Sequence, residues 1–200
     1  MTTTLFNTKT SPFLDADEQY LCVIASCLPK EIDAVKEPIL AAVVEKFPYA
    51  NIYEQTKVKR IPGTFYIVGD DIHRKIIIIF SQFYSGKQTY PNDNRQKRLE
   101  WFVQVLDEIS ELPDLKSLAF PSQIARDGAG NWSQYYQAIR DFSHTLHLKS
   151  RIPVSLYHNP IGEVNEADIQ TQISLLNCYN LMENVCLDQL RLVDNLDKLS

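Results

Sequence analysis

Apolar runs separated by turn residues mark the strands expected along the chain. Residues 19–26 (QYLCVIAS) are rich in strand-forming side chains and are soon followed by Pro29, so they are predicted to form a buried strand. Residues 75–80 (KIIIIF) are apolar and largely β-branched after the lysine, which is typical of a central strand covered on both faces. Shorter strands are predicted at 64–68, 118–120 and 154–157.

Two segments place apolar residues at the three- and four-residue spacing of a helix face. The clearer one is 95–110, which follows the turn-rich sequence YPNDN. Its apolar face consists of Leu99, Phe102, Val103, Leu106 and Ile109. The basic residues Arg95 and Arg98 near its start are expected to form surface ion pairs. Residues 132–147 are predicted to form the second helix.

A third helix is expected between residues 31 and 47, and it contains Pro38. Proline is tolerated in the first turn of a helix, because the amide that it lacks has no partner within the helix there. Pro38 therefore fits a helix that starts near Lys36 or Glu37, which leaves residues 31–35 as a loop or a separate turn. The carboxylates of this region are expected to form a solvated acidic turn before the helix.

This alternation of strands and helices predicts the fold class. Strands that alternate with amphipathic helices favour a three-layer α/β/α domain with a mixed sheet and helices on both faces. The predicted domain covers residues 1–160, and its last strand ends near His158.

The rest of the chain, residues 161–200, has a different pattern. Residues 166–199 contain neither Pro nor Gly and show no strand signal, so a C-terminal helical extension is predicted. A heptad-like apolar stripe, interrupted by Gln189, consists of Leu175, Tyr179, Met182, Cys186, Val193 and Leu196. Such a stripe must be buried, either against the chain's own domain or against a second copy or a protein partner.

Net charge and the length of the apolar runs exclude two classes of partner, nucleic acids and membranes. The formal net charge is −5, and the 20 Lys and Arg residues are scattered, so nucleic acid is not expected as a general partner. The most apolar run, 76–80, is too short to span a membrane, and residues 1–10 lack the apolar stretch of a signal peptide. A cytoplasmic protein is expected.

The four cysteines do not suggest a metal or redox site. Cys22, Cys27, Cys178 and Cys186 show no two-residue gap of the kind that zinc knuckles and thioredoxin-like motifs contain. No two of the four histidines lie four residues apart on a predicted helix, so we expect no metal site and no cofactor, with the thiols reduced.

Three stretches carry a resemblance to a known family. They are RKIIIIFSQFYSGK (74–87), YPNDNRQKRLEWFVQVLDEI (90–109) and KSLAFPSQIARDGAGNWSQYYQAIRDF (116–142). In order and spacing they resemble the macrodomains, the ADP-ribose-binding family, and in particular the branch of terminal ADP-ribose glycohydrolases and small viral or phage homologues. The resemblance extends from about residue 19 to 157 and implies the macrodomain fold.

The resemblance also implies two glycine-rich loops whose backbone amides hold a diphosphate. The first is replaced here by KEIDAVKE (30–37), whose carboxylates would repel a diphosphate. The second, IARDGAGN (124–131), keeps Gly128 and Gly130 and places Arg126 where it could contact an anion. Gln82 and Phe83, at the end of the central strand, complete the candidate ligand contacts, and Asp127 is the candidate catalytic residue.

Three functions are compatible with these residues. The altered loops favour a catalytically degenerate macrodomain that acts as a binding or interaction module, with an ADP-ribose-like molecule or a protein as its partner. An active ADP-ribosyl or phosphoester hydrolase using Asp127 is the first alternative. The second is a structural or assembly subunit of viral or phage origin that makes its contacts through the C-terminal helix.

Overall fold

A single mixed sheet organises the part of the chain that the computed structural model describes, residues 6–28, 37–86, 91–128 and 130–159. The strand order is β1-β6-β5-β2-β4-β3. All neighbouring strands are parallel except β3, which pairs antiparallel with β4 at one edge. The strands are β1 (Phe6–Pro12), β2 (Tyr20–Leu28), β3 (Thr64–Val68), β4 (Lys75–Tyr84), β5 (Leu118–Pro121) and β6 (Val154–Asn159).

The two longest strands form the centre of the sheet because both of their faces are covered. β2 and β4 pair in register from Tyr20 opposite Lys75 onward, and the register shifts between Ala25 and Ser26. Ile77, like its neighbours in β4, is completely buried. Burying such a side chain stabilises the fold by roughly 1.5–3 kcal/mol, so the predicted apolar run contributes substantially to core stability.

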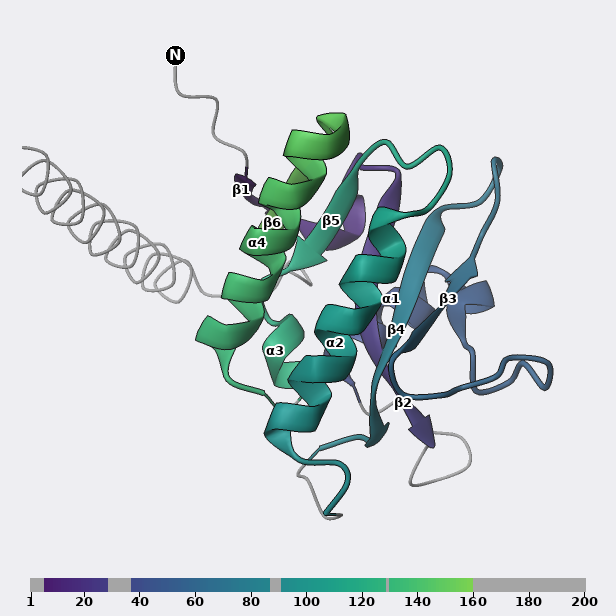
Figure 1. Ribbon diagram of the computed structural model, residues 1–200. Coiled ribbons are helices and arrows are strands. Elements are labelled where there is room, and N and C mark those ends of the chain that lie inside the picture. The colour runs from purple at the N-terminus through teal and green to yellow at the C-terminus, as the bar shows by residue number, and fades with distance from the viewer. Residues whose placement is uncertain (1–5, 29–36, 87–90, 129, 160–200) are drawn as a thin grey trace, which may run out of the picture. The chain divides into compact units, whose positions relative to one another are not determined.

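Helices cover both faces of this sheet, as predicted (Figure 1). α2 (Arg95–Ser110) and α4 (Trp132–Ser150) lie side by side on one face, and α1 (Pro38–Lys46) packs on the other. Shorter helical turns are η1 (Phe13–Asp15), η2 (Pro48–Ala50) and α3 (Ile124–Asp127). Ile39, Leu40 and Val43 of α1 pack against β2 and β4 in one core cluster. The α/β/α prediction is therefore confirmed.

Local signals set the helix starts. Pro38 is the first residue of α1 and Glu37 is its N-cap, so the helix begins one residue after the later of the two predicted starts, Lys36 and Glu37. The Asn94 side chain caps α2 by accepting a hydrogen bond from the Lys97 amide. The Asn131 side chain caps α4 by accepting one from the Ser133 amide. The predicted bounds of α2 are correct, whereas α4 continues three residues beyond the predicted end.

The sequence pattern missed the edge strand β1. It pairs parallel with β6, with Phe6 opposite Val154 and Lys9 opposite Tyr157. None of its seven residues is classed as buried, so it lacks the apolar alternation that reveals a strand.

Several predictions fall outside the described residues or concern what is absent from them. The C-terminal helix, its apolar stripe, Cys178 and Cys186 all lie outside those residues. Cys22 and Cys27 are free and buried. Within the described ranges no helix is long and apolar enough to cross a membrane, and no three His, Cys, Asp or Glu side chains cluster as metal ligands.

Candidate functional site

The candidate site lies where the central parallel strands end. Ser26 of β2 is opposite Gln82 of β4, and Leu28 is opposite Tyr84. Open α/β sheets bind ligands at the carboxyl ends of their strands. In this protein α1, α3 and the start of α2 surround those ends and contribute polar side chains to a buried cluster.

The centre of this cluster is an ion pair between Arg98 and Asp93. Arg98 is completely buried, and so is Asp93. The guanidinium Nε and Nη2 donate to the two carboxylate oxygens at 2.5 and 2.8 Å. This two-point geometry partly offsets the cost of removing both charges from water. The expected surface ion pair is therefore wrong for Arg98.

Arg98 also connects segments that are distant in sequence. Nη1 donates to Gln82 Oε1 at 2.6 Å, to the Gly86 carbonyl at 2.9 Å and to the Gly128 carbonyl at 3.3 Å. Nη2 donates to the Tyr84 carbonyl at 3.1 Å. One side chain thus joins the end of β4 to the loop that follows α3.

Gln82 extends the cluster toward α1 and α3. It was predicted as a ligand contact, and the structure places it at the expected strand end but completely buried. Its Oε1 accepts from Arg98, and its Nε2 donates to Glu37 Oε1 at 3.2 Å and to the Asp127 carbonyl at 3.0 Å. Both ends of the amide are engaged by protein groups.

Glu37 is buried too, which corrects the expectation of a solvated acidic turn for this residue. Only 2% of it is exposed, and its Oε1 accepts from the Ser26 amide at 3.0 Å. The Tyr53 hydroxyl lies 3.5 Å from the other oxygen. Burial raises the pKa of Glu37, although the hydrogen bonds that it accepts oppose the shift.

Asp127 places a second carboxylate at the start of α1. It is 4% exposed, and its Oδ2 accepts from the Ile39 amide at 3.2 Å. The first amides of a helix have no partner within the helix and attract anions. Its Oδ1 has no hydrogen-bond partner in the described part of the chain. Burial, reinforced by the nearby charge of Glu37, raises the pKa of Asp127 to about 7.

The two glycines predicted to contact a ligand both lie close to Tyr135. A Cβ on Gly128 would lie 2.7 Å from the Tyr135 hydroxyl, and a Cβ on Gly130 would lie 2.2 Å from Tyr135 Cε2. Neither glycine has a positive φ. The close approach of this aromatic ring is therefore a packing reason for glycine at both positions, and their role toward a ligand stays a prediction.

The other two predicted ligand contacts, Arg126 and Phe83, lie outside the polar cluster. Arg126 is exposed on α3. Phe83 is half-buried, packs against the α1-side core and makes an edge contact with Trp101 at 5.5 Å between ring centroids. The structure therefore brings together Gln82, Asp127 and Gly128, while Arg126 and Phe83 contribute no described contact to the polar cluster.

Sequence reasoning missed Arg98, Asp93 and Tyr53 as members of the cluster. One signal was present for Arg98, because it precedes the buried Phe102 by four residues and Val105 by seven. It therefore lies on the buried face of α2. A charged residue in such a stripe is rarely buried unless it is paired.

The chain was compared with protein families, with curated proteins and with solved structures. No family model and no curated protein matches the chain. Solved structures do match, among them the macrodomain of Thermus aquaticus DarG, with 18% identity, a TM-score of 0.53, and coverage of 76% of this chain and 97% of that one. A macrodomain protein from Streptomyces coelicolor is 16% identical, with a TM-score of 0.53 and coverage of 76% and 98%.

The macrodomain of Mycobacterium tuberculosis DarG is similar to the same extent, with 15% identity, a TM-score of 0.51 and coverage of 76% and 96%. Likeness at this level of identity shows the fold and does not transfer a site. The chain therefore has the macrodomain fold.

Proposed function

We propose that this protein is a degenerate macrodomain that works as a binding or interaction module and not as a hydrolase. The observation that carries the proposal is the Asp127 carboxylate on the Ile39 amide at the start of α1. In the family that the sequence resembles, the loop before this helix holds the diphosphate. Here the Asp127 carboxylate accepts the hydrogen bond of the Ile39 amide, which would otherwise be available to a bound anion.

Charge supports the same conclusion. Asp127 is negatively charged above its pKa of about 7, and in that form it and Glu37, both nearly buried, would face a diphosphate at the start of α1. Two like charges about 4 Å apart repel each other by about 4 kcal/mol at an effective dielectric constant of about 20. The amides of Ser26 and Ile39 are already hydrogen-bonded to these carboxylates, so little remains to offset that repulsion.

A titration with ADP-ribose and with pyrophosphate, the smaller probe, tests this proposal. We expect no heat from the natural chain, and binding of pyrophosphate by Asp127→Ala, which frees the Ile39 amide and removes one charge. Arg126→Ala, an exposed change on the same short helix, is the matched control and should behave like the natural chain. Micromolar binding of ADP-ribose to the natural chain that is lost in Gln82→Ala would contradict the blocked diphosphate position and would make ADP-ribose the ligand of the binding module.

A second candidate function, hydrolysis by Asp127, has one observation in its favour. A pKa of about 7 suits a general base near neutral pH. The same carboxylate is 4% exposed, however, and hydrogen-bonded to α1, so a substrate would have to displace it. Release of ADP-ribose from a modified protein by the natural chain, abolished in Asp127→Asn, would establish this alternative.

The C-terminal stripe supplies the interaction part of the proposal. Its residues, Leu175 to Leu196, favour a protein partner or a second copy, and an assembly role of viral or phage origin is the related alternative. Light scattering on the natural chain and on Met182→Glu tests self-association. A mass of two or more chains that falls to one in the variant is the expected result for an oligomer. One chain in both would assign the stripe to the chain's own domain or to another protein.

A further inference from the structure

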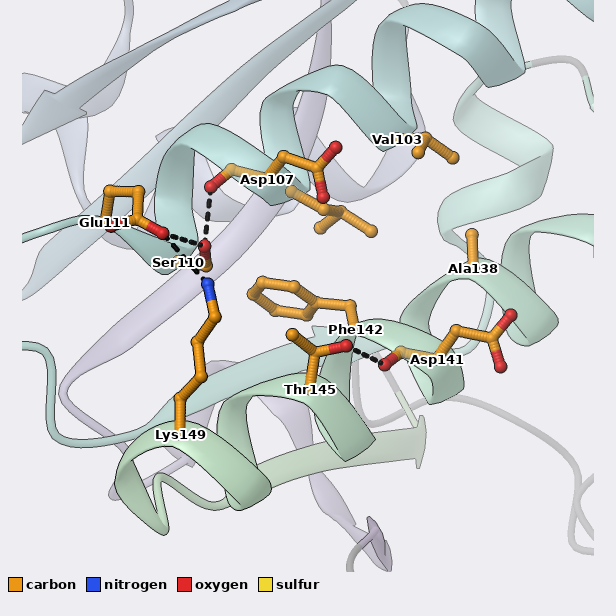
Figure 2. Close-up of a pocket in the computed structure, with 10 residues that line it drawn as sticks. Val103, Asp107, Ser110, Glu111, Ala138, Asp141, Phe142, Thr145 and Lys149 are labelled. Atoms are coloured by element: carbon orange, nitrogen blue, oxygen red, sulfur yellow. Dashed lines mark hydrogen bonds and ion pairs between the residues drawn. The ribbon is translucent and has the colours of Figure 1, made fainter.

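A groove with an apolar floor runs between the two helices that cover one face of the sheet. Two hollows of about 410 and 450 Å³ are lined by both helices, and a third of about 510 Å³ beside them is lined by α2 residues alone. Val103 lines all three. Figure 2 shows Val103 of α2 and Ala138 and Phe142 of α4 converging on one of these spaces. Val103 is 39% exposed, which is high for a valine at a helix seam. We refer to this groove as the α2–α4 groove.

The rim of the α2–α4 groove is strongly acidic. Asp107, Glu111 and Asp141 line the hollows between the two helices. Glu100 and Glu108, together with Asp107, line the adjoining hollow on α2. Lys149 is the single basic residue among the lining residues, and it pairs with Glu111 at 3.1 Å. Lys97, beside the groove, pairs with Glu100 at 3.0 Å. An unbalanced negative charge therefore borders the apolar floor.

We propose that the α2–α4 groove docks an amphipathic helix of a partner protein, with an apolar stripe on the floor and Lys or Arg residues on both flanks. From Leu99 to Ser110 the groove follows α2 for about 16 Å at 1.5 Å per residue, which matches three turns of a docked helix. Helices recognised in this way present apolar residues at steps of three and four to an apolar groove. Complementary charges on the rim accelerate association and fix orientation.

Charge selects this occupant over two others. A second copy of the same groove would bring acidic rims together, and like charges across an interface disfavour it. Residues 166–199 carry an apolar stripe, but they contain six acidic residues against two basic ones. A basic helix from another protein is the occupant that relieves the charge of the rim.

Fluorescence anisotropy with the full chain and a labelled helical peptide tests the proposal. The probe has about 18 residues, with leucines at steps of three and four and lysines on both flanks. A peptide of the same composition in scrambled order, with no apolar face, is its control. We expect the ordered peptide to bind at least about tenfold more tightly than the scrambled one, because only the ordered peptide can bury its leucines.

Substitutions in the α2–α4 groove test whether the peptide binds there. Val103→Glu and the double change Asp107→Lys with Asp141→Lys should each weaken binding about tenfold or more, because they remove the floor and the charge of the rim respectively. Ile72→Glu, a change at a 91% exposed residue between β3 and β4, should have no effect. Circular dichroism checks that each variant remains folded.

Three results in these experiments would overturn the proposal, and a cross-linking result would do the same. The three are equal binding of both peptides, unchanged binding to folded Val103→Glu, and a dimer of the natural chain that Val103→Glu dissociates. A cross-link between Val103→Cys and Cys178 or Cys186 within one chain would likewise assign the groove to the C-terminal segment. Because the groove lies on the α2–α4 layer, failure of this test leaves the ADP-ribose titration unaffected.

Discussion

Two clusters of charged residues in this protein use the same chemical groups in different surroundings. At the strand ends Arg98 and Asp93 are both completely buried. Beside the start of β2, Lys9 bridges Asp17 and Glu18 at 2.9 and 2.8 Å, and the Lys9 side chain is 33% exposed and that of Asp17 87% exposed. Arg98 and Asp93 are closed off from water and connect distant segments, whereas water reaches the second cluster through Lys9 and Asp17, although Glu18 is only 6% exposed.

This difference in solvation determines what each cluster contributes. Burial would raise the pKa of Glu18, but hydrogen bonds from Lys9, Ser155 and Tyr157 together hold it below its ordinary value. In the strand-end cluster burial raises the pKa values of Glu37 and Asp127 by more than the hydrogen bonds lower them, so both values lie above the ordinary ones. The comparison predicts large effects of substitution at the strand ends and small ones beside β2.

The largest effect is expected from Arg98→Met. It leaves the Asp93 carboxylate buried without a cation and removes the bonds to Gln82 and three carbonyls, so the free energy of unfolding should fall by about 3–5 kcal/mol. Urea unfolding followed by circular dichroism measures it. The double variant Arg98→Met with Asp93→Leu should recover part of the loss, since no unpaired charge remains. A loss below about 1 kcal/mol would contradict burial of this pair.

Asp127→Asn should make the protein more stable at high pH. The folded pKa of about 7 lies above the ordinary value of 3.8, so the stabilising protonated form is complete below about pH 4 and is lost as the pH rises to about 7. Asparagine cannot ionise and still accepts from the Ile39 amide. The variant should therefore gain up to about 4 kcal/mol over the natural chain at pH 8.

Urea unfolding at several pH values between 4 and 8 measures this difference. At pH 4 the two proteins should be similar, because Asp127 is protonated in the folded chain. Parallel stability curves across that range would show that Asp127 titrates normally. Asp141→Asn, a change on the exposed side of α4, serves as the control for removal of a surface carboxylate.

The two glycines beside Tyr135 separate a packing role from a ligand role. Gly128→Ala and Gly130→Ala should each cost about 1–3 kcal/mol, because each Cβ would meet the Tyr135 ring or hydroxyl. Adding Tyr135→Phe should restore Gly128→Ala, whose closest contact is the hydroxyl oxygen, but not Gly130→Ala, whose closest contact is a ring carbon. Thermal unfolding of the four variants measures this. Unchanged stability with altered ADP-ribose binding would favour a ligand role.

The smallest effect is expected from Lys9→Met. Glu18 keeps its hydrogen bond from the Tyr157 hydroxyl at 2.7 Å, and water replaces the exposed part of the ion pair. The free energy of unfolding should fall by about 1 kcal/mol or less, and the difference should shrink further in high salt. A loss comparable to that of Arg98→Met would contradict the contrast between the two clusters.

Most of the layer architecture could be predicted from local patterns. The β-branched run in β4 and the periodic apolar face of α2 identified a central strand and a covering helix with nearly correct bounds. Pro38 identified the start of α1. These features depend on spacing within one segment. Apolar residues recur every two residues along a strand with one buried face and every 3.6 residues along such a helix, so they can be recognised in the sequence.

The candidate site depended on contacts between segments. Gln82 could be named from its position at a strand end and Asp127 from the resemblance of its loop to that of the family. The partners of Arg98 could not be named, since Asp93, Gln82 and the Gly128 carbonyl meet it only in the folded chain. β1 was missed because none of its side chains is buried and its partner β6 lies about 150 positions away. Periodicity therefore determined which faces are buried, whereas the folded packing decided which polar groups share a buried space and so which charges they retain.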